Sequence, residues 1–186
     1  MNALDFVTVE NVMPIEFCKE FITQSNKEKW SKHKWTYDYN KSENATIDEK
    51  KEWCDVQYIT PKLQDLLIPF THEAIDIYSN KFMEDNMSVL ITKFSTPRLN
   101  RYQVGQGMSK HYDHIHSLFA DNEGIPVLSL VGVFNDNYEG GNFVVRDKQI
   151  SLKTGDILIM PSIFIYPHKV TKVTKGVRHS FVSWAY

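Results

Sequence analysis

Hydrophobic residues in the first half of the chain recur at helical spacing in two segments. The first segment follows Met13-Pro14, and the second, longer one follows Thr60-Pro61. The apolar positions of the first are Phe17, Cys18, Phe21 and Ile22, and those of the second are Leu63, Leu66, Leu67, Phe70, Ala74, Tyr78 and Phe82. The pattern predicts two helices, each with one apolar face packed on a sheet.

From about residue 88 onward the pattern changes to short apolar runs separated by turn residues. The runs predict strands at 89–94, 99–104, 111–115, 127–134, 142–145, 157–161, 168–173 and 177–184. Glycines mark most of the turns between them. Many short strands at this spacing favour a sandwich or barrel over an alternating α/β sheet.

Length and composition fit one domain of 186 residues with a substantial core, since 42% of the residues are hydrophobic. The net charge of −2 does not favour a nucleic-acid-binding or membrane-surface protein, because both classes usually carry a basic excess. The two cysteines, Cys18 and Cys54, form no CxxC pair, so we expect reduced thiols in a cytoplasmic protein. No signal peptide is visible, and no apolar run approaches the roughly 18 residues of a membrane helix.

Candidate metal ligands lie in the third quarter of the chain and near its end. Residues i and i+2 of a strand point to the same side, so His111 and Asp113 can face one cavity while Tyr112 points away. Together with His168 they supply two imidazoles and one carboxylate. That donor set occupies one face of an octahedral metal, as in non-haem Fe(II) oxygenases.

A competing pair, His114 and His116, overlaps this motif. A site built on that pair needs a glutamate a few residues later, and the nearest one, Glu123, follows His116 by seven residues. We therefore favour His111 and Asp113. Alone, His168 is equally consistent with a core histidine, so only the joint pattern indicates a metal site.

Arg178 changes the metal hypothesis into a reaction hypothesis, because a cation near the metal can hold the far carboxylate of a diacid. The turn at Lys175-Gly176 predicts a hairpin that returns Arg178 beside His168. Strand parity places Ser180 and Trp184 on the same face as Arg178. Ser180 can add a hydroxyl, and Trp184 either closes the far end of the pocket or is a plain core aromatic.

As an ordered set, several motifs between Leu99 and Trp184 resemble the Fe(II)/2-oxoglutarate-dependent dioxygenases, most of all the prolyl 4-hydroxylase-like branch. These motifs are His111-x-Asp113, Gly140-Gly141-Asn142-Phe143, Lys153-Thr154-Gly155-Asp156 and His168-x-Val-x-x-Val-x-x-Gly-x-Arg178. The resemblance implies a mainly β fold with supporting helices (α+β): a double-stranded β-helix, or jelly roll, with N-terminal helices packed on one sheet. We expect a single domain over 1–186, with helical support and a lid region in 1–87 and the jelly-roll core in 88–186.

The resemblance also implies roles for individual residues. His111, Asp113 and His168 match the iron ligands, and Arg178 matches the residue that pairs with the distal carboxylate of 2-oxoglutarate. Tyr102 matches a tyrosine that hydrogen-bonds the same co-substrate. Val133 stands where many relatives have another tyrosine, so one co-substrate contact differs here.

The implied reaction uses Fe(II), 2-oxoglutarate and O2, with ascorbate as reductant, and gives succinate and CO2 as co-products. The expected substrate is a prolyl or other residue of a protein or peptide, with neither nucleic acid nor membrane as a partner. Three alternatives stay open: a free amino acid or small molecule, a nucleic acid, and a non-catalytic jelly-roll binding module. Nucleic-acid demethylases of the AlkB type carry a second arginine where this chain has Trp184. The polar segment between aromatic residues at 35–53 is a candidate lid or an ordinary surface loop.

Overall fold

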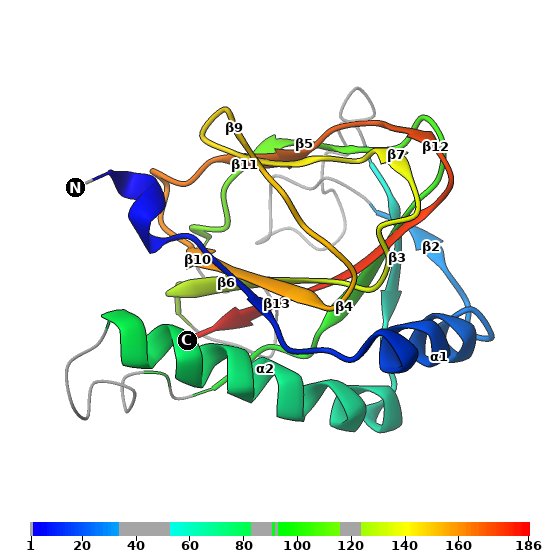
Figure 1. Ribbon diagram of the computed structural model, residues 1–186, viewed down its shortest axis with the longest axis horizontal. Helices are drawn as coiled ribbons and strands as arrows, with labels where there is room; N and C mark the ends of the chain where they lie inside the picture. Colours follow the sequence, from blue (N-terminus) through cyan, green and yellow to red (C-terminus); the bar gives the residue numbers. More distant parts are fainter. Residues whose placement is uncertain (1, 34–52, 83–90, 92, 116–123) are drawn as a thin grey trace, which may run out of the picture.

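The computed structural model describes residues 2–33, 53–82, 91, 93–115 and 124–186. Two β-sheets face each other, and two helices cover the outer face of the larger sheet (Figure 1). The helices are α1 (Ile15–Ser25) and α2 (Pro61–Phe82), and a short 3-10 helix, η1 (Ala3–Phe6), precedes the first strand. None of the helices in these ranges has both the length and the apolar character of a membrane span.

The larger sheet has seven antiparallel strands and draws on both halves of the chain. Its order is β1 (Thr8–Asn11), β10 (Asp156–Pro161), β6 (Leu128–Val133), β13 (Arg178–Ala185), β4 (Arg98–Tyr102), β3 (Asp55–Tyr58) and β2 (Ser31–Lys32). The smaller sheet runs β5 (Met108–His111), β11 (His168–Val170), β8 (Phe143–Val145) and β9 (Lys148–Ile150), and β12 (Val173–Lys175) pairs with β7 (Glu139–Gly140).

The period of two along the strands divides the core into two layers. On β10, Ile157 and Ile159 pack with the helices, whereas Leu158 and Met160 pack between the sheets. Gly132 on β6 leaves room for the ring of Phe181, because a Cβ at this glycine would lie 1.9 Å from that ring. The close approach holds β6 and β13 together at the centre of the larger sheet.

The expected mainly β architecture with helical support is confirmed. Both helices lie where the apolar spacing predicts them. Leu66 is an exception to the predicted stripe, since 37% of its surface is exposed. Strands β1, β2, β3, β7 and β9 overlap none of the predicted strand ranges, and the predicted strand 89–94 falls largely outside the described residues.

One topological prediction is wrong: His168 and Arg178 do not belong to a hairpin. The predicted strand 168–173 divides into β11, which pairs with β5 and β8, and β12, which pairs with β7. Arg178 begins β13, which pairs with β4 and β6 in the other sheet. The two residues therefore meet across the space between the sheets.

Two expectations about the N-terminal half remain predictions. Strands β1, β2 and β3 of this half join the larger sheet, so it supplies strands as well as helices. The predicted division into a supporting region, 1–87, and a jelly-roll core, 88–186, stays an expectation. The candidate lid at 35–53 lies outside the described residues except for Trp53.

Candidate active site

The side chains of His111, Asp113 and His168 converge in a pocket between the two sheets. Their potential ligand atoms all lie within 4.8 Å of one another. His111 ends β5 and His168 begins β11, and the two residues are direct cross-strand partners. The predicted strand 111–115 is wrong in its bounds, because β5 ends at His111 and Asp113 lies two residues beyond it. Asp113 is nevertheless buried and 49% of the Tyr112 surface is exposed, so the two side chains lie on opposite sides as expected.

Backbone carbonyls orient both imidazole rings so that their Nε2 atoms lie near Asp113. The Nδ1 of His111 lies 2.7 Å from the carbonyl oxygen of Ser109, and the Nδ1 of His168 lies 3.1 Å from that of Tyr166. A carbonyl oxygen only accepts, so each Nδ1 carries the proton and each Nε2 keeps its lone pair. The Nε2 atoms lie 3.7 and 3.6 Å from the carboxylate oxygens of Asp113.

The electrostatics of this cluster favour the protonation states that bind a metal. Burial, together with the neighbouring His168, lowers the pKa of His111 to about 4, so its imidazole is neutral at pH 7. Burial alone would raise the pKa of Asp113, but the two histidines outweigh it and lower that pKa. The Ser129 hydroxyl donates to Asp113 Oδ2 at 2.7 Å and stabilises the carboxylate further.

Arg178 lies in the same pocket with two of its nitrogen atoms unpaired. The residue is only 1% exposed, and its Nη1 donates to the Ser180 hydroxyl at 2.7 Å. Within the described part of the chain, its Nε and Nη2 are buried without a hydrogen-bond partner. A buried cation with free donors is costly unless an anion compensates it, and a guanidinium fork matches a carboxylate.

The other predicted co-substrate residues surround Arg178. Tyr102 is its cross-strand partner, and the Arg178 guanidinium lies 5.1 Å from the centre of the Tyr102 ring. Ser180 accepts a hydrogen bond from Nη1 of Arg178, and Trp184 lines the same pocket four residues further along β13. The structure thus brings all seven predicted residues into one pocket.

His114 lies outside the metal cluster. Its ring contacts Phe164 edge to face at 5.9 Å, and it is absent from the group of converging ligand atoms within the described ranges. The other members of the competing motif, His116 and Glu123, fall outside the described residues.

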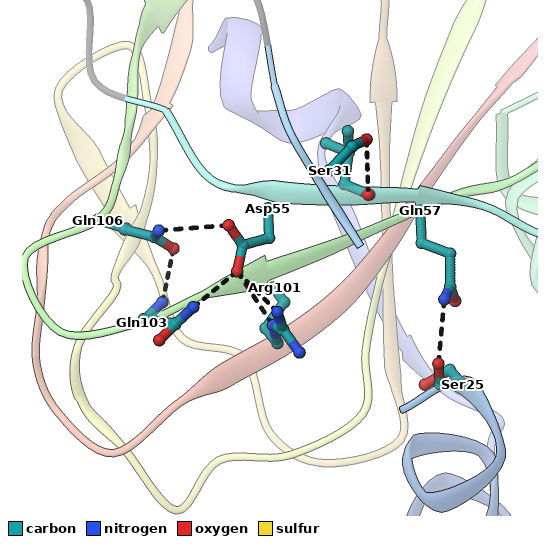
Figure 2. Close-up of polar contacts among 8 residues, drawn as sticks. Ser25, Ser31, Asp55, Gln57, Arg101, Gln103 and Gln106 are labelled. Atoms are coloured by element: carbon teal, nitrogen blue, oxygen red, sulfur yellow. Dashed lines mark hydrogen bonds and ion pairs between the residues drawn. The ribbon is translucent and has the colours of Figure 1, made fainter. Parts of the chain in front are cut away.

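Asp55 fixes the turn that leads from β4 into the metal-binding strand (Figure 2). Its Oδ2 accepts from Nε and Nη2 of Arg101 at 3.1 and 2.9 Å and from Gln103 Nε2 at 2.8 Å. Gln106 closes the turn with its Oε1, which accepts from the backbone N–H of Gln103 at 2.8 Å. The carboxylate therefore positions the residues that immediately follow Tyr102.

Sequence reasoning alone missed three polar pocket residues: Ser129, Asn100 and Arg98. The latter two could have been found by strand parity, since positions 98, 100 and 102 of β4 share one face with Tyr102. Ser129 carries no local signal, because its contact with Asp113 joins β6 to the segment that follows β5 in the other sheet.

Comparisons with known proteins agree with this geometry. Residues 97–186 match the family model described as 2OG-Fe(II) oxygenase superfamily. A PKHD-type hydroxylase of Saccharophagus degradans is 30% identical over 130 residues, which cover 62% of this chain and 55% of that protein. The chain spans about half the length of the curated relatives it matches.

Solved structures share the fold at low identity. A prolyl-4-hydroxylase of Pseudomonas putida matches with a TM-score of 0.67 at 14% identity, covering 96% of this chain and 91% of that one. A prolyl hydroxylase of Trichoplax adhaerens, in complex with a hypoxia inducible factor peptide fragment, matches with a TM-score of 0.71 at 14% identity, covering 100% and 86%. Residues 97–186 are thus similar in sequence to the 2OG-Fe(II) oxygenase superfamily, and the chain shares its fold with these prolyl hydroxylases.

Proposed function

We propose that this protein is an Fe(II)- and 2-oxoglutarate-dependent oxygenase that hydroxylates a prolyl or other residue of a protein or peptide. The observation that carries the proposal is a His-Asp-His cluster that shares its pocket with a buried arginine whose Nε and Nη2 have no partner among the described residues. The donor set fits Fe(II), and the free guanidinium edge fits the distal carboxylate of 2-oxoglutarate.

The chain's own residues would hold and shield the reactants. Iron bound at the cluster would supply the oxidative chemistry that converts 2-oxoglutarate and O2 to succinate and CO2 while one oxygen atom enters the substrate. His111 and His168 present Nε2 lone pairs, and Asp113 presents an ionised carboxylate. Arg178 fixes the far end of 2-oxoglutarate, so that the co-substrate lies in one orientation.

Apolar side chains on both sheets keep water from this site. Met108, Val131, Phe143 and Val170 line the pocket, and each is less than 5% exposed. The ring of Phe143 stacks on His168 with centroids 5.6 Å apart. Exclusion of water strengthens the charge pairing between Arg178 and a bound carboxylate.

A peptide substrate is supported by two of the relatives named above. The Trichoplax protein is a prolyl hydroxylase seen with a peptide, and the Pseudomonas protein is a prolyl-4-hydroxylase. We extend that substrate class to this chain. We also propose ascorbate as the reductant that keeps the iron in its ferrous state, and a cytoplasmic location.

Succinate formation tests the reaction class. Protein supplied with Fe(II), ascorbate, O2 and 2-oxoglutarate should form succinate slowly even without a substrate. His111→Ala should abolish this turnover and weaken Fe(II) binding, whereas His114→Ala, a loss of the histidine three residues away, should retain both. Wild-type protein that forms no succinate, with His111→Ala still binding Fe(II) normally, would refute the proposal.

The substrate is tested by mass spectrometry. Proline-containing peptides and cell extract, incubated with the loaded protein, should yield a product heavier by one oxygen atom that depends on 2-oxoglutarate. Turnover of 2-oxoglutarate with no oxygenated peptide in either sample would contradict the peptide substrate while leaving the reaction class intact.

A further inference from the structure

A second arginine, Arg98, lines the pocket at the end opposite Arg178. On β4, Arg98, Asn100 and Tyr102 point to one face, and β13 pairs Tyr102 with Arg178 and Val182 with Arg98. The backbone positions of the two arginines are therefore four residues apart in register, roughly 13 Å at about 3.3 Å per residue. Their guanidinium groups lie against different rings, that of Tyr102 for Arg178 and that of Trp184 for Arg98.

Neighbouring side chains hold Arg98 in place but do not neutralise it. Its Nε donates to Asn100 Oδ1 at 3.2 Å, and its guanidinium lies 5.7 Å from the centre of the Trp184 ring. Within the described ranges, Arg98 has no carboxylate partner, whereas its neighbour Arg101 is paired with Asp55. Asn100 is 2% exposed and Trp184 is 4% exposed, so both supports of Arg98 are fixed in the protein core.

The location of Trp184 relates Arg98 to the metal site. Trp184 pairs in register with Ser129, whose hydroxyl donates to the carboxylate of Asp113. The indole of Trp184 thus lies between the metal-ligand carboxylate and the guanidinium of Arg98. A group bound to Arg98 would therefore lie at the side of the metal cluster that is away from Arg178.

The charges of the pocket leave Arg98 uncompensated. Asp113 is the one acidic residue among the described residues that line the pocket, and Arg98 and Arg178 are its two arginines. Fe(II) with Asp113 and one carboxylate of 2-oxoglutarate is neutral, and Arg178 with the other carboxylate is neutral as well. One positive charge, that of Arg98, remains for a further anion.

We propose that Arg98, supported by Asn100 and Trp184, binds a carboxylate of the substrate and so selects substrates that carry one near the site of hydroxylation. This inference rests on the proposed function and narrows its substrate class. The carboxylate can come from an acidic side chain of a peptide or from the α-carboxylate of a free amino acid, and both make the same bidentate pair with a guanidinium.

The test compares an acid with its neutral amide. N-acetyl-L-proline and N-acetyl-L-prolinamide are titrated calorimetrically into protein loaded with Fe(II) and 2-oxoglutarate without O2. A hydrogen bond to a charged group contributes about 1.5–3 kcal/mol, so wild-type protein should bind the acid roughly 10- to 150-fold more tightly. In Arg98→Gln the ratio of the two affinities should fall to about one, because glutamine keeps polar atoms but has no charge.

Matched variants separate a local charge from the total charge. Arg146→Gln removes an arginine outside the pocket, whose Nη1 donates to the carbonyl oxygen of Ile165, and should keep the wild-type ratio. Arg98→Lys should retain part of the preference, because an ammonium keeps the charge without the fork.

The two sources of the carboxylate are distinguished with free L-proline and with the peptides acetyl-Asp-Pro-Ala-amide and acetyl-Ala-Pro-Ala-amide. If the Asp peptide binds more tightly than the Ala peptide and Arg98→Gln abolishes this difference, the carboxylate comes from an acidic side chain. If the affinity for free L-proline depends on Arg98, the carboxylate is the α-carboxylate.

Equal wild-type affinity for acid and amide, undetectable binding of both included, overturns the inference. It is also overturned if Arg98→Gln weakens 2-oxoglutarate binding as much as Arg178→Gln does, because Arg98 would then belong to the co-substrate site. The acid-to-amide ratio is independent of succinate formation, so its failure is distinguishable from failure of the proposed function.

Discussion

Replacement of Arg178 by methionine tests the co-substrate site most directly. Its Nε and Nη2 have no partner among the described residues and are available for a two-point contact with a carboxylate. Two charge-assisted hydrogen bonds of about 1.5–3 kcal/mol each predict a loss of about 3–6 kcal/mol in 2-oxoglutarate binding. That loss corresponds to a dissociation constant raised roughly 10²- to 10⁴-fold.

The same variant should not destabilise the ligand-free protein. Methionine replaces a buried, uncompensated cation by an apolar side chain of similar length, a change that is often neutral or stabilising. Urea unfolding of the metal-loaded protein without O2 measures both effects together. At 100 times the wild-type dissociation constant, 2-oxoglutarate adds about 2.7 kcal/mol to the free energy of unfolding, and a 100-fold weaker site reduces this gain to about 0.4 kcal/mol.

Calorimetric titration with Fe(II) and then 2-oxoglutarate completes the assay. Fe(II) affinity should be unchanged in Arg178→Met, because the three metal ligands are other residues. The reasoning is refuted if the variant retains wild-type affinity for 2-oxoglutarate, or if it loses Fe(II) instead.

Three further predictions concern the surroundings of the site. Ser129→Ala removes the hydroxyl that donates to Asp113 and should weaken Fe(II) binding about 10- to 100-fold in a metal titration; an unchanged affinity would show that this contact is dispensable. Asp55→Asn leaves the Arg101 guanidinium without its anion and should lower the free energy of unfolding, measured in urea, by about 1–3 kcal/mol. The control Glu139→Gln, in an exposed ion pair, should change it by less than about 0.5 kcal/mol. Equal effects of the two variants would contradict the positioning role of Asp55. Burial, with Arg101 and Arg178 nearby, lowers the pKa of His179 to about 4 from its usual 6.5. Between these two pH values the unfolded chain therefore binds one more proton than the folded protein. The free energy of unfolding should fall as the pH drops from 6.5 to 4, by at most about 1.4 kcal/mol per pH unit from this residue. His179→Asn should flatten that part of the urea-measured pH profile, and an identical slope in both proteins would exclude His179 as the cause.

The helices and most strands of the C-terminal half could be predicted because their signals are local. A helix of this length displays its apolar stripe within its own sequence, as α2 does, and short strands show a period of two between glycine turns. The pair His111 and Asp113 was predictable as a candidate metal site for the same reason, since its spacing is itself local. Strand β1 gave no such signal, because its place at the sheet edge depends on pairing with β10, far along the chain.

Which sheet a residue joins is not a local property. The alternation of side chains along a strand predicted that Arg178, Ser180 and Trp184 share a face, and in the structure all three line one pocket. The same period did not reveal that β13 pairs with β4 and β6 rather than with the strand before it. Strand partners depend on which apolar faces are buried together, and these pairs join residues as distant in the sequence as Arg98 and Val182.

By itself, the sequence determined the donor atoms of this protein: two imidazoles, a carboxylate and a guanidinium, in an order that matches one oxygenase superfamily. Only the tertiary structure decided that His168 and Arg178 line one pocket from different sheets, and that Arg98 is a second cation in this pocket. The physical reason is that the type of each side chain, which fixes its donor atoms, is given by the sequence alone. The distance between side chains depends on long-range strand pairing and on packing such as that of Phe181 over Gly132.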